Sequence, residues 1–153
     1  MRTTYVTVTL IAALSLAACG GEDRLTEREL AGQLNPQVER IAREFGEVFR
    51  TLGRARETDV VPGNVRVRLR QAAAIERRVA EDFEDIAPPE DAEDDVEALA
   101  AAAARHADRL EQLSSDRRLT VARMADAIER GEIMAPLQRL AADSLVRLPG
   151  HQP

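Results

Sequence analysis

Mostly apolar residues recur at steps of three and four along three separate stretches of this 153-residue chain. That spacing places the apolar side chains on one face of an α-helix, as at the a and d positions of helices that pack together. The chain is therefore constrained to helices that each bury one stripe against their neighbours. The three stripes are Val38, Ile41, Phe45, Val48 and Leu52; Val65, Leu69, Ala72, Ile75, Val79, Phe83 and Ile86; and Ala92, Val96, Leu99, Ala103, His106, Leu110 and Leu113.

Capping residues and prolines predict where these helices begin and end. Thr26 and Glu29 have the spacing of a capping box, so a first turn or two is expected there. Asn35-Pro36 has the order of an N-cap followed by proline at the first helical position, which predicts the start of the long helix. Asn64 is expected to cap the second helix. Ala87-Pro88-Pro89 ends it, because a residue before proline avoids the helical region and proline lacks an N–H group.

Residues 65–70, VRVRLR, alternate with period two and so also resemble a β-strand. We favour a helix, because the helical stripe continues from Val65 to Ile86 and no second strand is evident to pair with this segment.

The last third of the chain predicts two shorter helical segments. Ser114-Ser115-Asp116 is expected to cap the first of them, and Gly131 interrupts its stripe. The second is expected to begin near Pro136 and to stop at Pro149-Gly150. The pattern leaves open whether residues 114–117 and 131–136 break or only kink the helices. Their apolar residues are Val121, Met124 and Ile128, then Leu137, Leu140, Leu145 and Leu148.

Long amphipathic helices joined by short connections lie antiparallel to their neighbours. The chain is also rich in Ala, Leu, Glu and Arg, which favour helix. The predicted fold class is therefore all-α, an antiparallel up-and-down helical bundle of four to five helical segments.

The first 18 residues have the layout of a secretory signal peptide. Arg2 is a minimal positive region, residues 6–18 are mostly apolar, and small residues precede Cys19, the single cysteine of the chain. The apolar run is shorter than the roughly 20 residues that a membrane-spanning helix needs. Leu16-Ala17-Ala18-Cys19 also resembles the lipobox of bacterial lipoproteins. The resemblance implies that the leader is cut before Cys19 and that its sulfur is joined to a diacylglycerol.

The rival interpretation is ordinary secretion with Cys19 left as a free thiol. With the lipobox, the chain divides into a lipoprotein signal peptide over 1–18, a lipidated cysteine and short tether over 19–25, a helical bundle domain over 26–148 and a tail over 149–153. The pattern over residues 83–148 is similar to that of small all-helical lipoproteins of high-GC Gram-positive bacteria, most of which have no assigned activity.

Composition and motifs argue against several function classes. The formal net charge is −6, and Phe45, Phe49 and Phe83 are the only aromatic residues after the leader, which disfavours nucleic-acid partners. No nucleophile elbow, glycine-rich phosphate loop or zinc motif is present. No catalytic residue, metal ligand or cofactor is therefore assigned, and we expect the protein not to be an enzyme.

Among the residues of the three stripes, His106 is the one that could ligate a metal or a haem, with Met124 or Met134 as a haem partner. No CxxCH motif occurs, and residue 103 is alanine, so the paired Glu-x-x-His motif of di-iron bundles is absent. We favour a residue at the edge of the bundle with a water or carboxylate partner. On that basis, His106→Leu is expected to be neutral or stabilising.

Ten acidic residues without an intervening cation surround the predicted proline turn. They are expected to form a solvated tip, at the same end of the bundle as the tether. A site for a divalent cation or a basic partner is the alternative, although the spacing of an EF-hand is absent. This acidic patch consists of Glu81, Asp82, Glu84, Asp85, Glu90, Asp91, Glu93, Asp94, Asp95 and Glu97.

These observations predict a lipid-anchored, extracytoplasmic bundle that acts as a non-enzymatic interaction or structural module at the cell envelope. Its expected partners are the membrane, through the anchor, and an envelope protein or polymer. The alternative is a carrier of a small ligand or a weakly bound divalent cation. A cavity lined by Phe45, Phe49, Phe83 and Ala103 would support a carrier, and a filled core with an exposed apolar stripe would support the module.

Overall fold

A computed structural model of the chain describes residues 24–53, 55–129 and 131–148. The expected leader, Cys19, most of the tether and the tail from residue 149 lie outside these described residues. Within them the chain forms five α-helices and one short 3₁₀ helix. These elements are α1 (Glu27–Leu52), α2 (Gly63–Glu84), η1 (Glu90–Ala92), α3 (Glu93–Ser115), α4 (Val121–Glu129) and α5 (Met134–Ala142).

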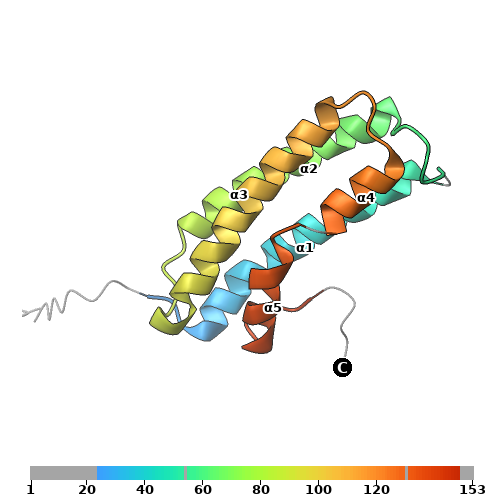
Figure 1. Cartoon of the computed structure of the whole chain (residues 1–153). Coiled ribbons are helices and arrows are strands. Elements are labelled where there is room, and N and C mark those ends of the chain that lie inside the picture. The colour runs from blue at the N-terminus through green and yellow to red at the C-terminus, as the bar shows by residue number, and fades with distance from the viewer. Residues whose placement is uncertain (1–23, 54, 130, 149–153) are drawn as a thin grey trace, which may run out of the picture.

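The helices form an antiparallel up-and-down bundle, as predicted (Figure 1). α2 and α3 pack side by side along most of their lengths, and α1 contacts α2. α4 and α5 complete the bundle as two short pieces in place of a fourth long helix. Residues 65–70 are helical. The helices are broken and not only kinked in both doubtful places, because α3 ends at Ser115 before α4 starts at Val121, and α4 ends at Glu129 before α5 starts at Met134.

The start of α1 confirms one predicted signal and corrects the other. Thr26 and Glu29 form the expected capping box, in which the Thr26 side chain accepts from the Glu29 N–H and the Glu29 carboxylate accepts from the Thr26 N–H. Asn35-Pro36 does not start a helix, because α1 continues through Pro36. Burial of Leu30 and Leu34 holds the turns before the proline in the helix.

Asn35 does not cap a helix; its side chain links α1 to the C-terminal segment by hydrogen bonds. Its Oδ1 accepts a hydrogen bond from the N–H of Arg147 at 2.7 Å, and its Nδ2 donates to the carbonyl of Ala31 at 2.7 Å. The side chain therefore holds the end of the described chain against the first helix.

The prediction that Asn64 caps α2 was wrong. The N-cap is Pro62, and no side chain caps this helix. The start is fixed by the preceding residue, Val61, whose N–H donates to the carbonyl of Leu119 at 2.8 Å and whose carbonyl accepts from the Arg66 guanidinium at 3.0 Å. Tertiary contacts therefore replace the local cap.

The short helices also begin and end differently from the prediction. Asp116 lies in the turn after α3, and the Thr120 hydroxyl accepts from the N–H of Arg123 in the first turn of α4. The N–H groups of Val121 and Ala122 donate to carbonyls of the α1–α2 connection, at Asp59 and Glu57. α5 begins at Met134 and ends at Ala142, well before Pro149-Gly150, and Ser144 follows with φ 62°.

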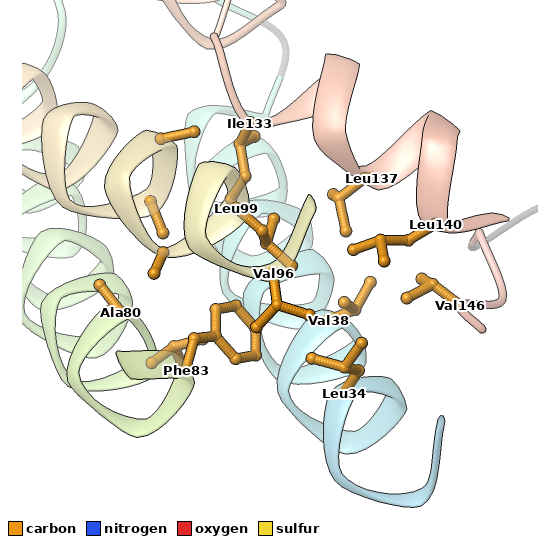
Figure 2. Packing of buried hydrophobic residues seen from close by; sticks show 14 of the residues in the cluster. Leu34, Val38, Ala80, Phe83, Val96, Leu99, Ile133, Leu137, Leu140 and Val146 are labelled. Atoms are coloured by element: carbon orange, nitrogen blue, oxygen red, sulfur yellow. The ribbon is translucent and has the colours of Figure 1, made fainter. Parts of the chain in front are cut away.

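Two clusters of buried apolar residues form the core. The larger one joins α1, α2, α3, α5 and the residues after α5, and the smaller one joins the opposite ends of α1, α2 and α3 to α4. Figure 2 shows the larger cluster, where the Phe83 ring of α2 lies beside Val96 of α3, and Leu137 and Leu140 project from α5. Both clusters draw on the predicted stripes.

The tether end of the bundle is tied to the proline turn. The N–H of Leu25 donates to the carbonyl of Ala87 at 2.8 Å, and Arg24 forms an ion pair with Glu93 at 2.7 Å. The start of α1 and the α2–α3 connection therefore lie together at one end. None of the helices in the described ranges is long and apolar enough to cross a membrane.

Candidate functional site

A buried pair of ionisable side chains joins the middle of α2 to the middle of α3. Nδ1 of His106 lies 2.9 Å from Oε2 and 3.2 Å from Oε1 of Glu76. Glu76 is 1% exposed and His106 is 3% exposed. With Ser114 they are the only buried polar or charged residues of the part of the chain that the structure describes. Because an unpaired polar group is costly to bury, Glu76 and His106 each rely on the other as a hydrogen-bond partner.

The helical register places both side chains in the core. On α3, His106 follows Leu99 and Ala103 and precedes Leu110 in the predicted stripe. On α2, Glu76 stands four residues after Ala72 and three before Val79, which are both buried. The two stripes face each other, so the carboxylate and the imidazole meet between the helices.

The rest of the imidazole is enclosed by α1 and by the α4–α5 connection. The ring of Phe45 lies 5.6 Å from the ring of His106, centre to centre, with a tilt of 51°. A Cβ atom on Gly131 would lie 2.9 Å from Nε2 of His106 and 3.0 Å from Cδ2. Any side chain at this position would displace the ring or the connection, so the close approach requires glycine.

Nε2 is the one buried side-chain nitrogen or oxygen that forms no hydrogen bond within the described residues. Glu76 holds Nδ1 and thereby fixes the orientation of the ring. The unpartnered nitrogen is therefore held in one place, beside Gly131.

Burial determines how the pair holds its protons. Desolvation raises the pKa of the Glu76 carboxyl, and the hydrogen bond and charge of His106 partly oppose that rise. Burial disfavours a net charge on the pair, which favours the states in which the two groups share one ionisable proton. The raised pKa of Glu76 favours the state in which a protonated Glu76 donates to Nδ1.

His106 and Gly131 line an open cleft of about 480 Å³ between α3, the turn after α3 and the α4–α5 connection. A volume of this order is within the range of small-ligand sites, about 300–1,000 Å³. Three arginines and three carboxylates line the cleft with them. These charged residues are Arg105, Arg109 and Arg123, with Asp108, Asp116 and Glu132.

Each carboxylate of the cleft already has an arginine partner. Glu132 pairs with Arg105, and Asp116 pairs with Arg123 at 3.2 Å. Asp108 accepts from Arg77 of α2 at 2.9 Å and shares that guanidinium with Glu111, which accepts from it at 2.8 Å.

Arg109 is the remaining cation, and it forms no ion pair with any other residue of the described ranges. The formal charges of the cleft lining balance, but the Arg109 guanidinium has no ion-pair partner among the described residues and stands in the cleft beside the imidazole.

The other predicted sites are not assembled into a centre. Within the described residues, no three His, Cys, Asp or Glu side chains gather in a way that could hold a metal ion. Met124 is fully buried in the smaller core cluster, and Met134 is 42% exposed. Cys19 lies outside the described residues, so lipidation stays a prediction.

The acidic patch spans the end of α2, the proline turn, η1 and the start of α3. The fold brings two arginines to it that the local sequence does not contain, because Arg24 pairs with Glu93 and Arg139 of α5 pairs with Asp95. Asp82 accepts from Gln37 of α1 at 3.1 Å. Part of the patch therefore ties neighbouring segments together.

Sequence analysis predicted a carboxylate or water partner for His106 but did not single out Glu76. The structure supplies that carboxylate, deep in the bundle and not at its edge. We therefore replace the expectation that His106→Leu is neutral or stabilising with the prediction of a loss of stability, because Glu76 would stay buried alone. The helical spacing could have predicted that Glu76 faces the core. Steps of four and three run without interruption through Val65, Leu69, Ala72, Glu76, Val79 and Phe83.

Comparison of the chain with protein-family models, with curated proteins and with solved structures finds no match.

Proposed function

We propose that this protein is a lipid-anchored extracytoplasmic lipoprotein whose helical bundle acts as a non-enzymatic interaction or structural module at the cell envelope. The observation that carries the proposal is the leader that ends in Leu16-Ala17-Ala18-Cys19, followed after only a few residues by the first helix. Two or three acyl chains on Cys19 would hold the bundle firmly at a bilayer, whereas one chain anchors only marginally.

The packing of the bundle supports a module more than an apolar carrier. Phe83 and Ala103 are 1% and 0% exposed within the core, whereas Phe49 is 40% exposed on the surface. Phe45 packs against both core clusters. These four residues therefore do not line a common cavity in the described part of the chain.

The anchor is tested by mass spectrometry of the purified protein together with membrane fractionation. The mature chain should begin at an acylated Cys19, and Cys19→Ala should leave the leader uncut or release the domain from membranes. Ser15→Ala is the matched control, because it keeps the leader apolar and the cysteine in place. An unmodified thiol on a soluble mature chain would refute the anchor.

The module is tested by photo-cross-linking in cells. A photoreactive side chain at the exposed position of Phe49 should form a discrete adduct with an envelope component, and Cys19→Ala should abolish it. A photoreactive side chain at Glu39, an exposed residue of the same helix, is the control. Identical labelling at both positions would indicate random collisions and would count against a docking surface.

A further inference from the structure

The cleft beside His106 has a feature that packing alone does not explain. Nε2 of His106 is buried, is held in place through Nδ1 by Glu76, and has no partner within the described residues. A buried donor or acceptor without a partner is costly. Nε2 lies at the side of the ring where the imidazole meets Gly131 and the cleft.

The proton shared by the pair determines what Nε2 can do. If protonated Glu76 donates to Nδ1, the neutral imidazole carries its own hydrogen on Nε2. This state presents an N–H donor toward Gly131, and such a donor selects an acceptor as its partner.

The pairing of charges around the cleft leaves Arg109 as the group that would attract an acceptor with negative charge. Arg105 and Arg123 are engaged by Glu132 and Asp116, and Asp108 is engaged by Arg77. Arg109 is left with five N–H donors, no ion-pair partner among the described residues and a position on the wall of the same cleft. A guanidinium binds carboxylate and phosphate oxygens in a bidentate geometry.

Gly131 determines how closely a ligand can approach the imidazole. Gly131 lies directly against the buried Nε2, so an anion that binds this nitrogen must displace the Gly131 backbone. A methyl group at Gly131 would itself stand beside the nitrogen, 2.9 Å from Nε2.

We propose that this cleft binds a small oxyanion, a carboxylate or a phosphate group, that accepts hydrogen bonds from the Nε2–H of His106 and from the guanidinium of Arg109. Glu76 acts as a positioning residue, which orients the imidazole and keeps the hydrogen on Nε2. The site goes beyond the proposed envelope module and does not depend on the lipid anchor.

The test is a titration of the full-length chain, labelled with ¹⁵N and ¹³C at histidine and followed by NMR of the imidazole rings. Sodium acetate and sodium phosphate are added in separate titrations against a chloride control of equal ionic strength and pH. His151, assigned with the variant His151→Gln, is the internal reference. At least one of the two anions should shift the His106 signals saturably, and Nε2 should carry a hydrogen throughout the titration.

The variants distinguish the site from a general charge effect. Arg109→Gln should weaken binding by about tenfold or more, because a charged hydrogen bond is lost. Gly131→Ala should abolish it, with circular dichroism to check the fold. Arg43→Gln, an exposed arginine of α1 that lies away from the cleft, should bind as the unaltered chain does.

Saturation by phosphate alone identifies a phosphate ligand, saturation by acetate alone identifies a carboxylate, and saturation by both identifies a general oxyanion site. Three results would overturn the proposal. They are shifts that do not saturate with either anion, an equal loss of binding in Arg109→Gln and Arg43→Gln, or an Nε2 without hydrogen that responds to added Zn²⁺ instead.

Discussion

Removing either member of the Glu76–His106 pair leaves the other buried without its partner. His106→Leu should therefore lower the free energy of unfolding by about 1–3 kcal/mol, because the buried Glu76 carboxyl loses its hydrogen-bond partner. The double variant Glu76→Met/His106→Leu removes both polar groups and should recover most of that loss. Urea denaturation of the two variants measures the difference. Equal stability of His106→Leu and the unaltered chain would show that Glu76 does not depend on the imidazole.

The protonation of Glu76 makes a distinct contribution to the pH dependence of stability. Its pKa in the folded chain is raised above the ordinary 4.5, so the native state retains a proton that the unfolded state releases. The stability that this carboxyl contributes is therefore complete below 4.5 and declines as the pH rises toward its folded pKa.

Glu76→Gln removes this titration while it keeps a polar partner for His106. The unfolding free energy of the unaltered chain minus that of Glu76→Gln should therefore decrease as the pH rises from about 4 to about 8. Urea denaturation across this range measures the difference, with Glu39→Gln on the exposed face of α1 as the control. A difference that increases with pH would contradict the assignment.

At the scale of the helices, the three phenylalanines differ in how much they contribute to packing. Phe83→Ala should cost about 3–5 kcal/mol, because its ring is 1% exposed between α2 and its neighbours. Phe45→Ala should cost less, since that ring is only partly buried, although the stripe predicted a core position. Phe49→Ala should be close to neutral, because its ring is 40% exposed. Chemical denaturation measures the free energy of unfolding of the three variants. A loss of stability in Phe49→Ala as large as that in Phe83→Ala would contradict the packing described here.

Local signals in the sequence predicted the helices where one short segment determines the outcome. The apolar stripes, the proline turn at 87–89 and the capping box at Thr26 all depend on neighbours within one or two turns, and all appear in the structure. Pro36 was misinterpreted because burial of residues on either side outweighs its local preference to start a helix. The start of α4 was missed because backbone carbonyls from residues 57 and 59 cap it.

The candidate site was only half predictable for the same reason. His106 stood out as a polar residue in a stripe. On α2, by contrast, the apolar pattern fits either Ile75 or Glu76 at the core-facing position, and the apolar Ile75 was assigned to the stripe. Ile75 is partly buried, and Glu76 is the residue that faces the core. The approach of Gly131 and the lone Arg109 depend on the connection between α4 and α5, which no pattern in the sequence places near α3.

At the scale of the whole molecule, the contact between Leu25 and Ala87 fixes which end of the bundle follows the tether. The acidic patch lies at that end, and Arg24 and Arg139 each pair with one of its carboxylates. If Cys19 is lipidated, the patch faces the lipid headgroups across a few residues, each of which spans at most about 3.6 Å.

Repulsion between the patch and anionic headgroups then sets the distance of the bundle from the bilayer. Its range is the Debye length, about 8 Å at physiological salt and longer at low salt. We predict that the lipidated protein stands off or tilts on anionic vesicles at low salt, and approaches when Mg²⁺ or Ca²⁺ bridges carboxylates to phosphates. Because the single native cysteine would carry the lipid, Ala87→Cys offers a unique thiol for a fluorophore at this end.

Quenching of that fluorophore by labelled lipid reports the distance. It should be weak in salt-free buffer and should increase with added Mg²⁺ or Ca²⁺. A fluorophore on Arg118→Cys, in the turn at the opposite end of α3, should be quenched little under either condition. Strong quenching at residue 87 in salt-free buffer that does not respond to either cation would mean that the acidic end rests on the membrane despite its charge, and that this patch does not control the orientation of the bundle.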